Sequence, residues 1–291
     1  MIRPHGSDSL TALLVKDSVR RAALEAQAVK LPQWIISSAA AANAVMLGAG
    51  YFTPLTGFMN KADALSVATD MRTSDGLFWP VPVLNLVADG HGIAVGSRIA
   101  LRDPNVSGDP VIAIQEVEAV EELTDEEIDL ITQKVYRTVD PGHPGVATFS
   151  SLGKFVISGP IEVLNLSYFE SEFPGTFRTA GQIREEIAER GWETVVAFQT
   201  RNPMHRAHEE LCKIASDMVG ADGVLIHMLL GKLKPGDIPA EVRDAAIRKM
   251  VDLYFPSNSV MIGGVGFVMF MRGREKQCCM RCSDRMPVAH T

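Results

Sequence analysis

The segment from Gln199 to Glu209 gathers two Arg, two His and several amide or hydroxyl side chains, in the order QTRNPMHRAHE. It follows residues 194–198, a short apolar run rich in β-forming types that predicts a core strand. Asn202 is a favoured N-cap residue and Pro203 suits a first helical position, so a helix is expected over 203–219. Such a helix would direct its free N–H groups and the positive end of its dipole beyond the strand.

Cationic and hydrogen-bonding side chains at this turn are suited to holding an anion, most naturally a phosphate. His205 and His208 are three residues apart and share one helix face, and Arg201 adds a planar, permanently charged fork. Two alternatives stay open: the histidines could ligate a metal, although no third ligand is apparent, or they could be ordinary surface residues. We favour the phosphate because such a cationic cluster is unusual in an acidic chain.

The composition is that of a globular protein with one large domain or two ordinary ones. The 291 residues are 46% hydrophobic and 22% charged, with a net charge of −7, so no global positive field would attract nucleic acid. No apolar run approaches the ~20 residues of a membrane span. The N-terminal residues MIRPHGSDSL lack a signal-peptide core, and four cysteines supply no disulfide framework. We therefore expect a cytoplasmic protein without membrane or nucleic-acid partners.

The chain up to Glu172 is rich in strands and turns and predicts a mixed α+β or barrel-like domain. Helices are expected at 17–29, 61–71 and 124–136, the last opening with the capping-box pair Thr124 and Glu127. Strands are expected between turn sequences, at 78–86, 98–101, 111–120 and 155–158. The stretch His143-Pro144-Gly145 is interpreted as a structural turn.

From Thr179 onward helices and strands alternate. The expected order is helix 182–190, strand 194–198, helix 203–219, strand 223–230, helix 239–254 and strand 259–262. This pattern predicts an α/β domain with a parallel sheet, in which ligands bind at the carboxyl ends of the strands. Lys232 and Lys234 follow one strand and either add positive potential there or are simply solvated. His227 lies within that strand and is interpreted as a core histidine, with a nucleotide contact as the alternative.

Several segments resemble the ATP sulfurylase (sulfate adenylyltransferase) family. The sequence QTRNPMHRAHEEL at 199–211 is similar to the family signature, and further similar segments occur at 48–59, 135–146, 159–161 and 225–238. The resemblance runs from about residue 10 to Phe267. It implies an N-terminal PUA-like domain, which we assign to residues 1–172. A Rossmann-like nucleotidyltransferase domain would follow over 173–267, and it would be incomplete at its C-terminal end.

The family resemblance also implies an activity. ATP and sulfate would be joined into adenosine 5′-phosphosulfate with release of pyrophosphate, or the reverse in sulfur oxidation. Mg²⁺ would accompany the nucleotide, no tightly bound protein metal is implied, and the chain would self-associate. Because sulfate is a weak nucleophile, alignment and charge neutralisation would carry the rate, without a covalent intermediate.

Roles for individual residues follow from the same resemblance. Gln199 and Arg201 would bind sulfate. Thr200, Arg201 and Asn202 would form a catalytic strip that orients the attack on the α-phosphorus of ATP. His205 and His208 would hold the ATP phosphates at the start of the helix.

Residues 268–291 depart from the family pattern. They contain three of the four cysteines, and residues 271–291 hold five Lys or Arg and two acidic residues, a net charge of +3. A Cys279/Cys282 pair has zinc-ligand spacing, but no second pair completes a site, so a zinc- or nucleic-acid-binding tail is disfavoured. We favour a change of reading frame after Phe267, which would leave a sheet edge open and little adenylyltransferase activity.

Three functional hypotheses stay open at this point. The first is a sulfate adenylyltransferase or its N-terminal two-thirds. The second is an inactive module that binds ATP or sulfate, or pairs with full-length subunits. The third is another nucleotidyltransferase with an HxxH motif, against which the Gln-Thr-Arg-Asn prefix argues.

Overall fold

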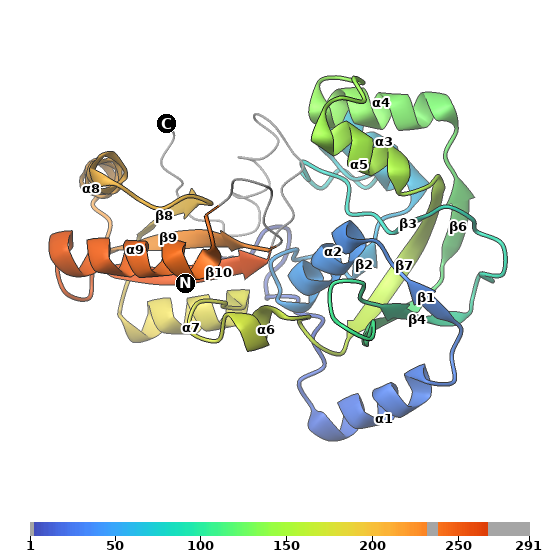
Figure 1. Ribbon diagram of the computed structural model, residues 1–291, viewed down its shortest axis with the longest axis horizontal. Helices are drawn as coiled ribbons and strands as arrows, with labels where there is room; N and C mark the ends of the chain where they lie inside the picture. The colour runs from blue at the N-terminus through green and yellow to red at the C-terminus, as the bar shows by residue number, and fades with distance from the viewer. Residues whose placement is uncertain (1–2, 232–237, 267–291) are drawn as a thin grey trace. The chain divides into compact units, whose positions relative to one another are not determined.

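The computed structural model describes residues 3–231 and 238–266 (Figure 1). The interpretations of Lys232, Lys234 and the 268–291 tail therefore fall outside the described residues. The described chain divides after Ser167 into two compact units, one from Pro4 to Ser167 and the other from Tyr168 onward. The mixed α/β class expected from the sequence is confirmed, and the two units differ in how their sheets are built.

The sheet of the N-terminal unit is organised around β7 (Phe155–Val163). Four strands pair with it in antiparallel fashion: β2 (Gly57–Phe58), β3 (Leu86–Val87), β5 (Val111–Glu116) and β6 (Ala119–Glu122). The sheet continues from β5 to β4 (Arg98–Arg102) and then to β1 (Gln33–Ile35). A single long strand therefore joins pairings that are far apart in the sequence.

Gly159 marks the point in β7 where the pairing partners change. Residues 155–158 pair with β6, residues 159–160 with β2, and residues 161–163 with β5. Gly159 has a φ of +130°, and a Cβ there would lie 2.1 Å from the carbonyl oxygen of Glu116. Only glycine tolerates both that backbone and that approach. The 159–161 segment is therefore required by the fold of this unit.

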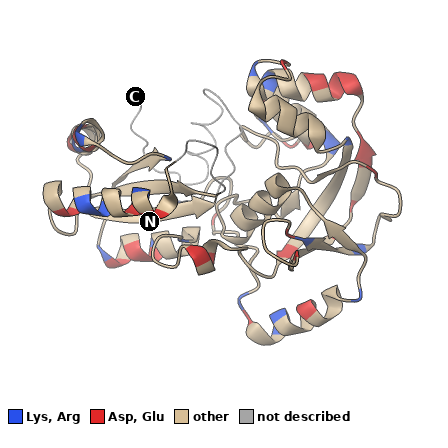
Figure 2. Cartoon of the chain, in the orientation of Figure 1, with Lys and Arg blue, Asp and Glu red and all other residues tan. Residues whose placement is uncertain are grey.

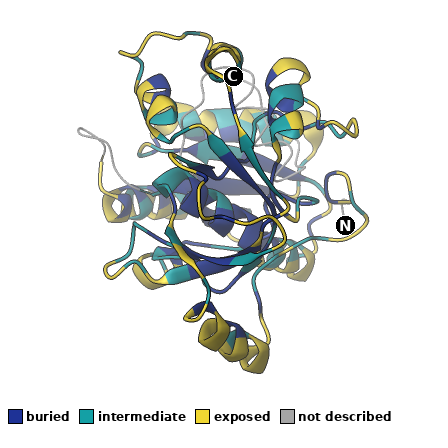
Figure 3. Ribbon diagram, turned by 90° about the vertical axis from the view of Figure 1, so that its right-hand side faces the viewer, coloured by how far each residue is buried: buried dark blue, intermediate teal, exposed yellow. Residues whose placement is uncertain are grey.

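Five helices of at least eight residues flank this sheet among the described residues: α1 (Ser18–Ala28), α2 (Ser38–Gly48), α3 (Lys61–Asp70), α4 (Asp125–Tyr136) and α5 (Pro144–Ser151). Side chains cap their N-termini, and the capping box expected at Thr124 and Glu127 of α4 is confirmed. The acidic first turn of α4 is evident in Figure 2. α2 is buried almost all round, whereas α1 is mostly exposed (Figure 3). The apolar run that begins at Ala39 is thus a core helix.

Three expectations for this unit were wrong in detail. The strand over 78–86 is reduced to β3, because Pro80 and Pro82 have no N–H to donate to a ladder. The strand over 111–120 is two strands, since β5 and β6 pair with opposite ends of β7. The stretch from His143 begins α5 instead of forming a turn, with His143 Nδ1 accepting from the N–H of Gly145 at 3.2 Å.

The C-terminal unit is an alternating α/β structure. After α6 (Phe169–Glu172) and α7 (Ala180–Glu189) its elements are β8 (Val195–Thr200), α8 (Arg206–Val219), β9 (Gly223–Leu230), α9 (Ala240–Tyr254) and β10 (Val260–Gly266). The sheet order is β10-β9-β8, and both pairings are parallel, which confirms the predicted sheet. α8 and α9 are neighbours, since the Arg206 guanidinium lies 4.0 Å from the centroid of the Tyr254 ring.

The two edges of this sheet differ. Residues 176–178 line the β10 edge, with the N–H of Gly264 donating to the Thr176 carbonyl at 2.6 Å. At the other edge, β8 pairs with β9 alone among the described residues. No helix in the described part of the chain is both long and apolar enough to cross a membrane.

Candidate active site

The expected site segment lies at the carboxyl end of β8. The side chains of β8 are buried or half-buried on both faces of the strand. β8 pairs with β9 along its length, and Gln199 lies opposite His227 and Thr200 opposite Met228. Loops at the carboxyl ends of parallel strands are where α/β sheets bind ligands. The chain therefore leaves the sheet at Thr200 and presents residues 201–205 at this edge.

The turn after β8 is closed by Thr200 itself. Its hydroxyl donates to the Asn202 carbonyl at 2.9 Å and accepts from the Asn202 N–H at 3.1 Å. Thr200 is buried, so its side chain shapes the backbone of Arg201 and Asn202. Of the other two residues of the expected catalytic strip, Arg201 is half-buried and Asn202 is exposed.

The helix after this turn starts three residues later than expected. α8 begins at Arg206 with His205 as its N-cap, and the His205 carbonyl accepts from the N–H groups of His208 and Glu209. Asn202 therefore does not cap the helix and Pro203 is not its first residue, because the Thr200 turn holds Asn202 in a separate structure. This correction places both histidines at the helix start itself, where free N–H groups and the dipole favour an anion.

His205 and His208 lie against each other. Their ring centroids are 3.9 Å apart, and the backbone N–H of His205 donates to His208 Nδ1 at 3.3 Å. Because Nδ1 accepts, the proton of the neutral His208 ring is on Nε2, which can donate to a ligand. Burial, and then the nearby His205, lower the pKa of His208 below its usual 6.5. The His208 ring is therefore mainly neutral at physiological pH.

Gln199 keeps hydrogen-bonding capacity in the sheet. Its Oε1 is buried and has no hydrogen-bond partner among the described residues. Gln199, His227 and Gly263 are register partners across β8, β9 and β10. A Cβ on Gly263 would lie 3.3 Å from His227 Cδ2, so the glycine leaves room for the imidazole, which is only 1% exposed. The core placement expected for His227 is confirmed.

Two buried charged residues beside the site were missed in the sequence. Glu209 on α8 has a fully buried side chain that contacts Arg206 at 2.9 Å and Lys213 at 2.6 Å. Arg243 on α9 is 2% exposed, and its Nη1 donates to the carbonyls of Arg201 at 3.0 Å and Leu229 at 2.8 Å. The available signal was spacing, because Arg243 occupies a core position of the α9 pattern formed with Ala240, Ile247 and Met250.

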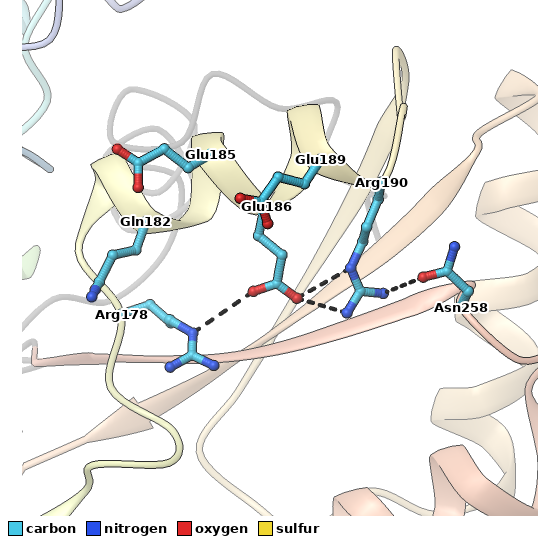
Figure 4. A pocket seen from close by; sticks show the side chains of 7 residues that line it. All are labelled: Arg178, Gln182, Glu185, Glu186, Glu189, Arg190 and Asn258. Atoms are coloured by element: carbon cyan, nitrogen blue, oxygen red, sulfur yellow. Dashed lines mark hydrogen bonds and ion pairs between the residues drawn. The ribbon is translucent and has the colours of Figure 1, made fainter.

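A surface hollow of about 530 Å³ lies elsewhere in this unit, along α7. Seven polar residues line it: Arg178, Gln182, Glu185, Glu186, Glu189, Arg190 and Asn258 (Figure 4). Glu186 pairs with Arg190 at 2.6 Å and with Arg178 at 3.8 Å, and Arg190 donates to Asn258 at 3.2 Å. These charges largely neutralise one another, and none of the expected site residues lines the hollow.

Comparison with known proteins identifies the family of both units. The family model of the PUA-like domain matches residues 2–166, and the model of the ATP-sulfurylase family matches residues 175–281, past Phe267. The sulfate adenylyltransferase of Alcanivorax borkumensis is 63% identical over 94% of this chain, which covers 68% of that relative. The chain belongs to the sulfate adenylyltransferase family.

Other relatives extend this result. The sulfate adenylyltransferase of Allochromatium vinosum is 62% identical, and that of the Riftia pachyptila sulfur-oxidizing endosymbiont is 55% identical. Each alignment covers 94% of this chain, corresponding to 69% and 62% of the relative. The chain thus spans about two thirds of the length of these family members, and the family assigns it to the nucleotidyltransferases of sulfur metabolism.

A solved structure shows the same fold. The hexameric APS kinase from Thiobacillus denitrificans has a TM-score of 0.75 and covers 98% of this chain, which corresponds to 51% of that protein. Its sequence identity is only 24%, so the likeness supports only the fold of this chain.

Proposed function

We propose that residues 199–208 of this chain bind sulfate and the phosphates of ATP for adenylyl transfer. The observation that carries the proposal is the placement of Arg201 and of the adjacent His205 and His208 around one strand-to-helix turn. Gln199 and Arg201 bind sulfate, a tetrahedral dianion that suits a guanidinium fork and amide donors. His205 and His208 bind the ATP phosphates at the α8 N-terminus.

The chemistry is a displacement at the α-phosphorus. A sulfate oxygen forms the new O–P bond while the bond to the β-phosphate oxygen breaks, and pyrophosphate leaves with that electron pair. Arg201 and Asn202 orient sulfate for this attack, and Thr200 holds their backbone through its bonds to Asn202. The His208 Nε2–H and the helix N–H groups stabilise the charge on the leaving phosphates.

Mg²⁺ belongs to the proposed reaction as the counter-ion of ATP. The described residues contain no group of three or more His, Cys, Asp or Glu side chains placed to ligate a metal ion. Oxygens of the nucleotide phosphates suit Mg²⁺, which keeps several waters and few protein ligands. We also propose a cytoplasmic location and self-association of the chain.

The test measures binding and turnover in the same preparation of the full chain. Pyrophosphate release that requires both ATP and sulfate supports transfer. Saturable binding of ATP or sulfate without pyrophosphate release would show that the chain is a binding module and does not catalyse transfer. If the chain shows neither ligand binding nor turnover, both the transfer function and the binding-module function are excluded.

The site assignment is tested with Arg201→Ala. Sulfate affinity should fall by about 100-fold, because a fork of charge-assisted hydrogen bonds is lost, while ATP affinity changes little. Lys249→Ala removes an exposed cation from the same unit and is the matched control. Loss of ATP affinity with unchanged sulfate affinity in Arg201→Ala would show that the roles are assigned wrongly.

A further inference from the structure

Arg243 on α9 is a buried cation close to the carboxyl end of β8. It lies in the first turn of α9, 2% exposed, where the helix dipole disfavours positive charge. Burying a guanidinium is costly unless its donors are satisfied. Its position therefore calls for a specific set of acceptors.

Two backbone carbonyls at the edge of the sheet are acceptors of this kind. Arg243 Nη1 donates to the carbonyl of Leu229, near the end of β9, at 2.8 Å and to the carbonyl of Arg201 at 3.0 Å. Arg201 is the first residue after β8, and its neighbour Thr200 is the last residue of the β8–β9 register. The guanidinium thus continues the connection between the two strands where their ladder ends.

The Arg201 backbone is consequently held from two directions. Thr200 Oγ1 bonds both the carbonyl and the N–H of Asn202 from within the turn. Arg243 holds the Arg201 carbonyl from α9. Together these contacts fix the direction in which the Arg201 and Asn202 side chains leave the sheet.

We propose that Arg243 is a positioning residue for adenylyl transfer, which fixes the Arg201 backbone so that the sulfate-binding side chains are preorganised. This inference rests on the proposed function, because it takes the loop after β8 to bind sulfate. Its structural part, the dependence of residues 201–204 on Arg243, stands independently. Preorganisation of this kind affects catalysis because small displacements of a positioned group lower the rate strongly.

Two substitutions distinguish the effect of the guanidinium group from the effects of positive charge and of side-chain volume. Arg243→Lys keeps the positive charge and the aliphatic stem, whereas Arg243→Met keeps only the stem. The matched control is Arg248→Met on the same helix, whose guanidinium donates to the Gly175 carbonyl at 3.0 Å and to Asp244 at 2.7 Å. That control removes a comparable contact that does not involve Arg201.

The first measurement is amide hydrogen exchange of the full chain without ligand. We expect faster exchange in residues 201–204 of both Arg243 variants and no change there in Arg248→Met. Unchanged exchange at 201–204 would overturn the inference. Acceleration spread evenly through the C-terminal unit would also overturn it, because it would indicate a general loss of stability. If Arg243→Met fails to fold, Arg243→Lys decides the matter.

The second measurement compares kinetic constants and chemical rescue. In Arg243→Met we expect kcat/KM for sulfate to fall by about 10- to 100-fold while KM for ATP changes less than threefold. Added guanidinium ion should restore part of the lost activity, which a purely structural defect would not allow. Equal losses for both substrates without rescue would contradict a positioning role. If the wild-type chain neither binds nor turns over, the proposed function fails, whereas hydrogen exchange still tests Arg243.

Discussion

The two units of the molecule bury polar groups for different purposes. In the N-terminal unit, Gln115 is fully buried, donates to the Ile157 carbonyl at 3.1 Å and accepts from Asn85 at 3.1 Å. Asp103, also fully buried, accepts from the N–H and the side chain of Asn105, each at 2.8 Å, and from Ser167. These bonds connect strands and loops of the scaffold to one another.

In the C-terminal unit the buried polar groups surround the end of β8. Thr200 and Arg243 bond the backbone of the loop that follows, and Glu209 holds two cations along α8. Burial of a polar group has a similar cost in both units. The buried polar groups therefore stabilise the scaffold in the N-terminal unit, whereas in the C-terminal unit they hold the loop that we propose binds sulfate.

The strongest way to break this comparison is the substitution Asp103→Ala. It removes the fully buried carboxylate that accepts from Asn105 and Ser167, which are themselves half-buried. We expect the free energy of unfolding to fall by about 3 kcal/mol, measured by urea denaturation, with no change in ATP or sulfate affinity of the folded protein. Asp89→Ala, which removes an exposed turn carboxylate that accepts from His91, is the control. Altered ligand affinity in Asp103→Ala would contradict the division of roles.

The substitution Glu209→Ala should have a smaller effect on stability and a measurable one on binding. Arg206 and Lys213 remain partly exposed, 65% and 37%, so water can solvate them after the carboxylate is removed. We expect a loss of about 1–2 kcal/mol and an ATP affinity lowered by about threefold, because the start of α8 is less fixed. Denaturation and equilibrium binding measure the two effects. Glu210→Ala, at an exposed position on the same helix, should change neither.

The sequence predicts those parts of this arrangement that local chemistry determines. Asp17 and Thr124 cap their helices as side-chain preference requires, and β9 has the predicted bounds. The parallel order of β8, β9 and β10 follows from the alternation of elements. For the candidate site, the apolar run at 194–198 predicted that residues 199–208 follow a strand, which β8 confirms.

Nonlocal contacts determine what the sequence does not predict. β7 is longer than its own propensity suggests, because four strands separated widely in sequence pair with it. The start of α8 shifts because the Thr200 hydroxyl holds Asn202 outside the helix. Arg243 lies some forty residues beyond the loop that it contacts, a separation shown by its bond to Arg201.

A still smaller effect is expected in the pH dependence of the unfolding free energy, through His208 in the C-terminal unit. The pKa of His208 is lowered in the folded chain by burial and by His205, from a usual value of 6.5. The unfolded chain therefore takes up a proton near pH 6.5, while the folded chain does so only at lower pH. Stability from this residue is complete above pH 6.5 and is lost as the pH falls below it. Once His208 is protonated, its Nδ1 can no longer accept the hydrogen bond from the His205 N–H.

The matched variant for this titration is His208→Asn. Its unfolding free energy should fall less between pH 7.5 and pH 5.5 than that of the wild-type chain, as measured by urea denaturation at each pH. Saturating ATP should reduce the wild-type loss, because bound phosphate favours a protonated imidazole. The same pH dependence in His208→Asn and wild type would show that other groups cause it.

The smallest effect is expected at Cys212, a buried thiol on α8 behind the site. Burial, and then the charge of Glu209, raise the pKa of Cys212 to about 12, so almost no thiolate forms near neutral pH. Because the thiolate is the reactive form, Cys212 should stay unlabelled by iodoacetamide in the folded chain and be labelled in urea. Peptide mass spectrometry distinguishes it from the other three cysteines. Glu209→Ala removes one cause of the raised pKa but leaves burial, the larger one, so labelling should stay slow. Rapid labelling in that variant would mean that Glu209 also keeps α8 packed on the sheet, and its role would then be the scaffold role seen in the N-terminal unit.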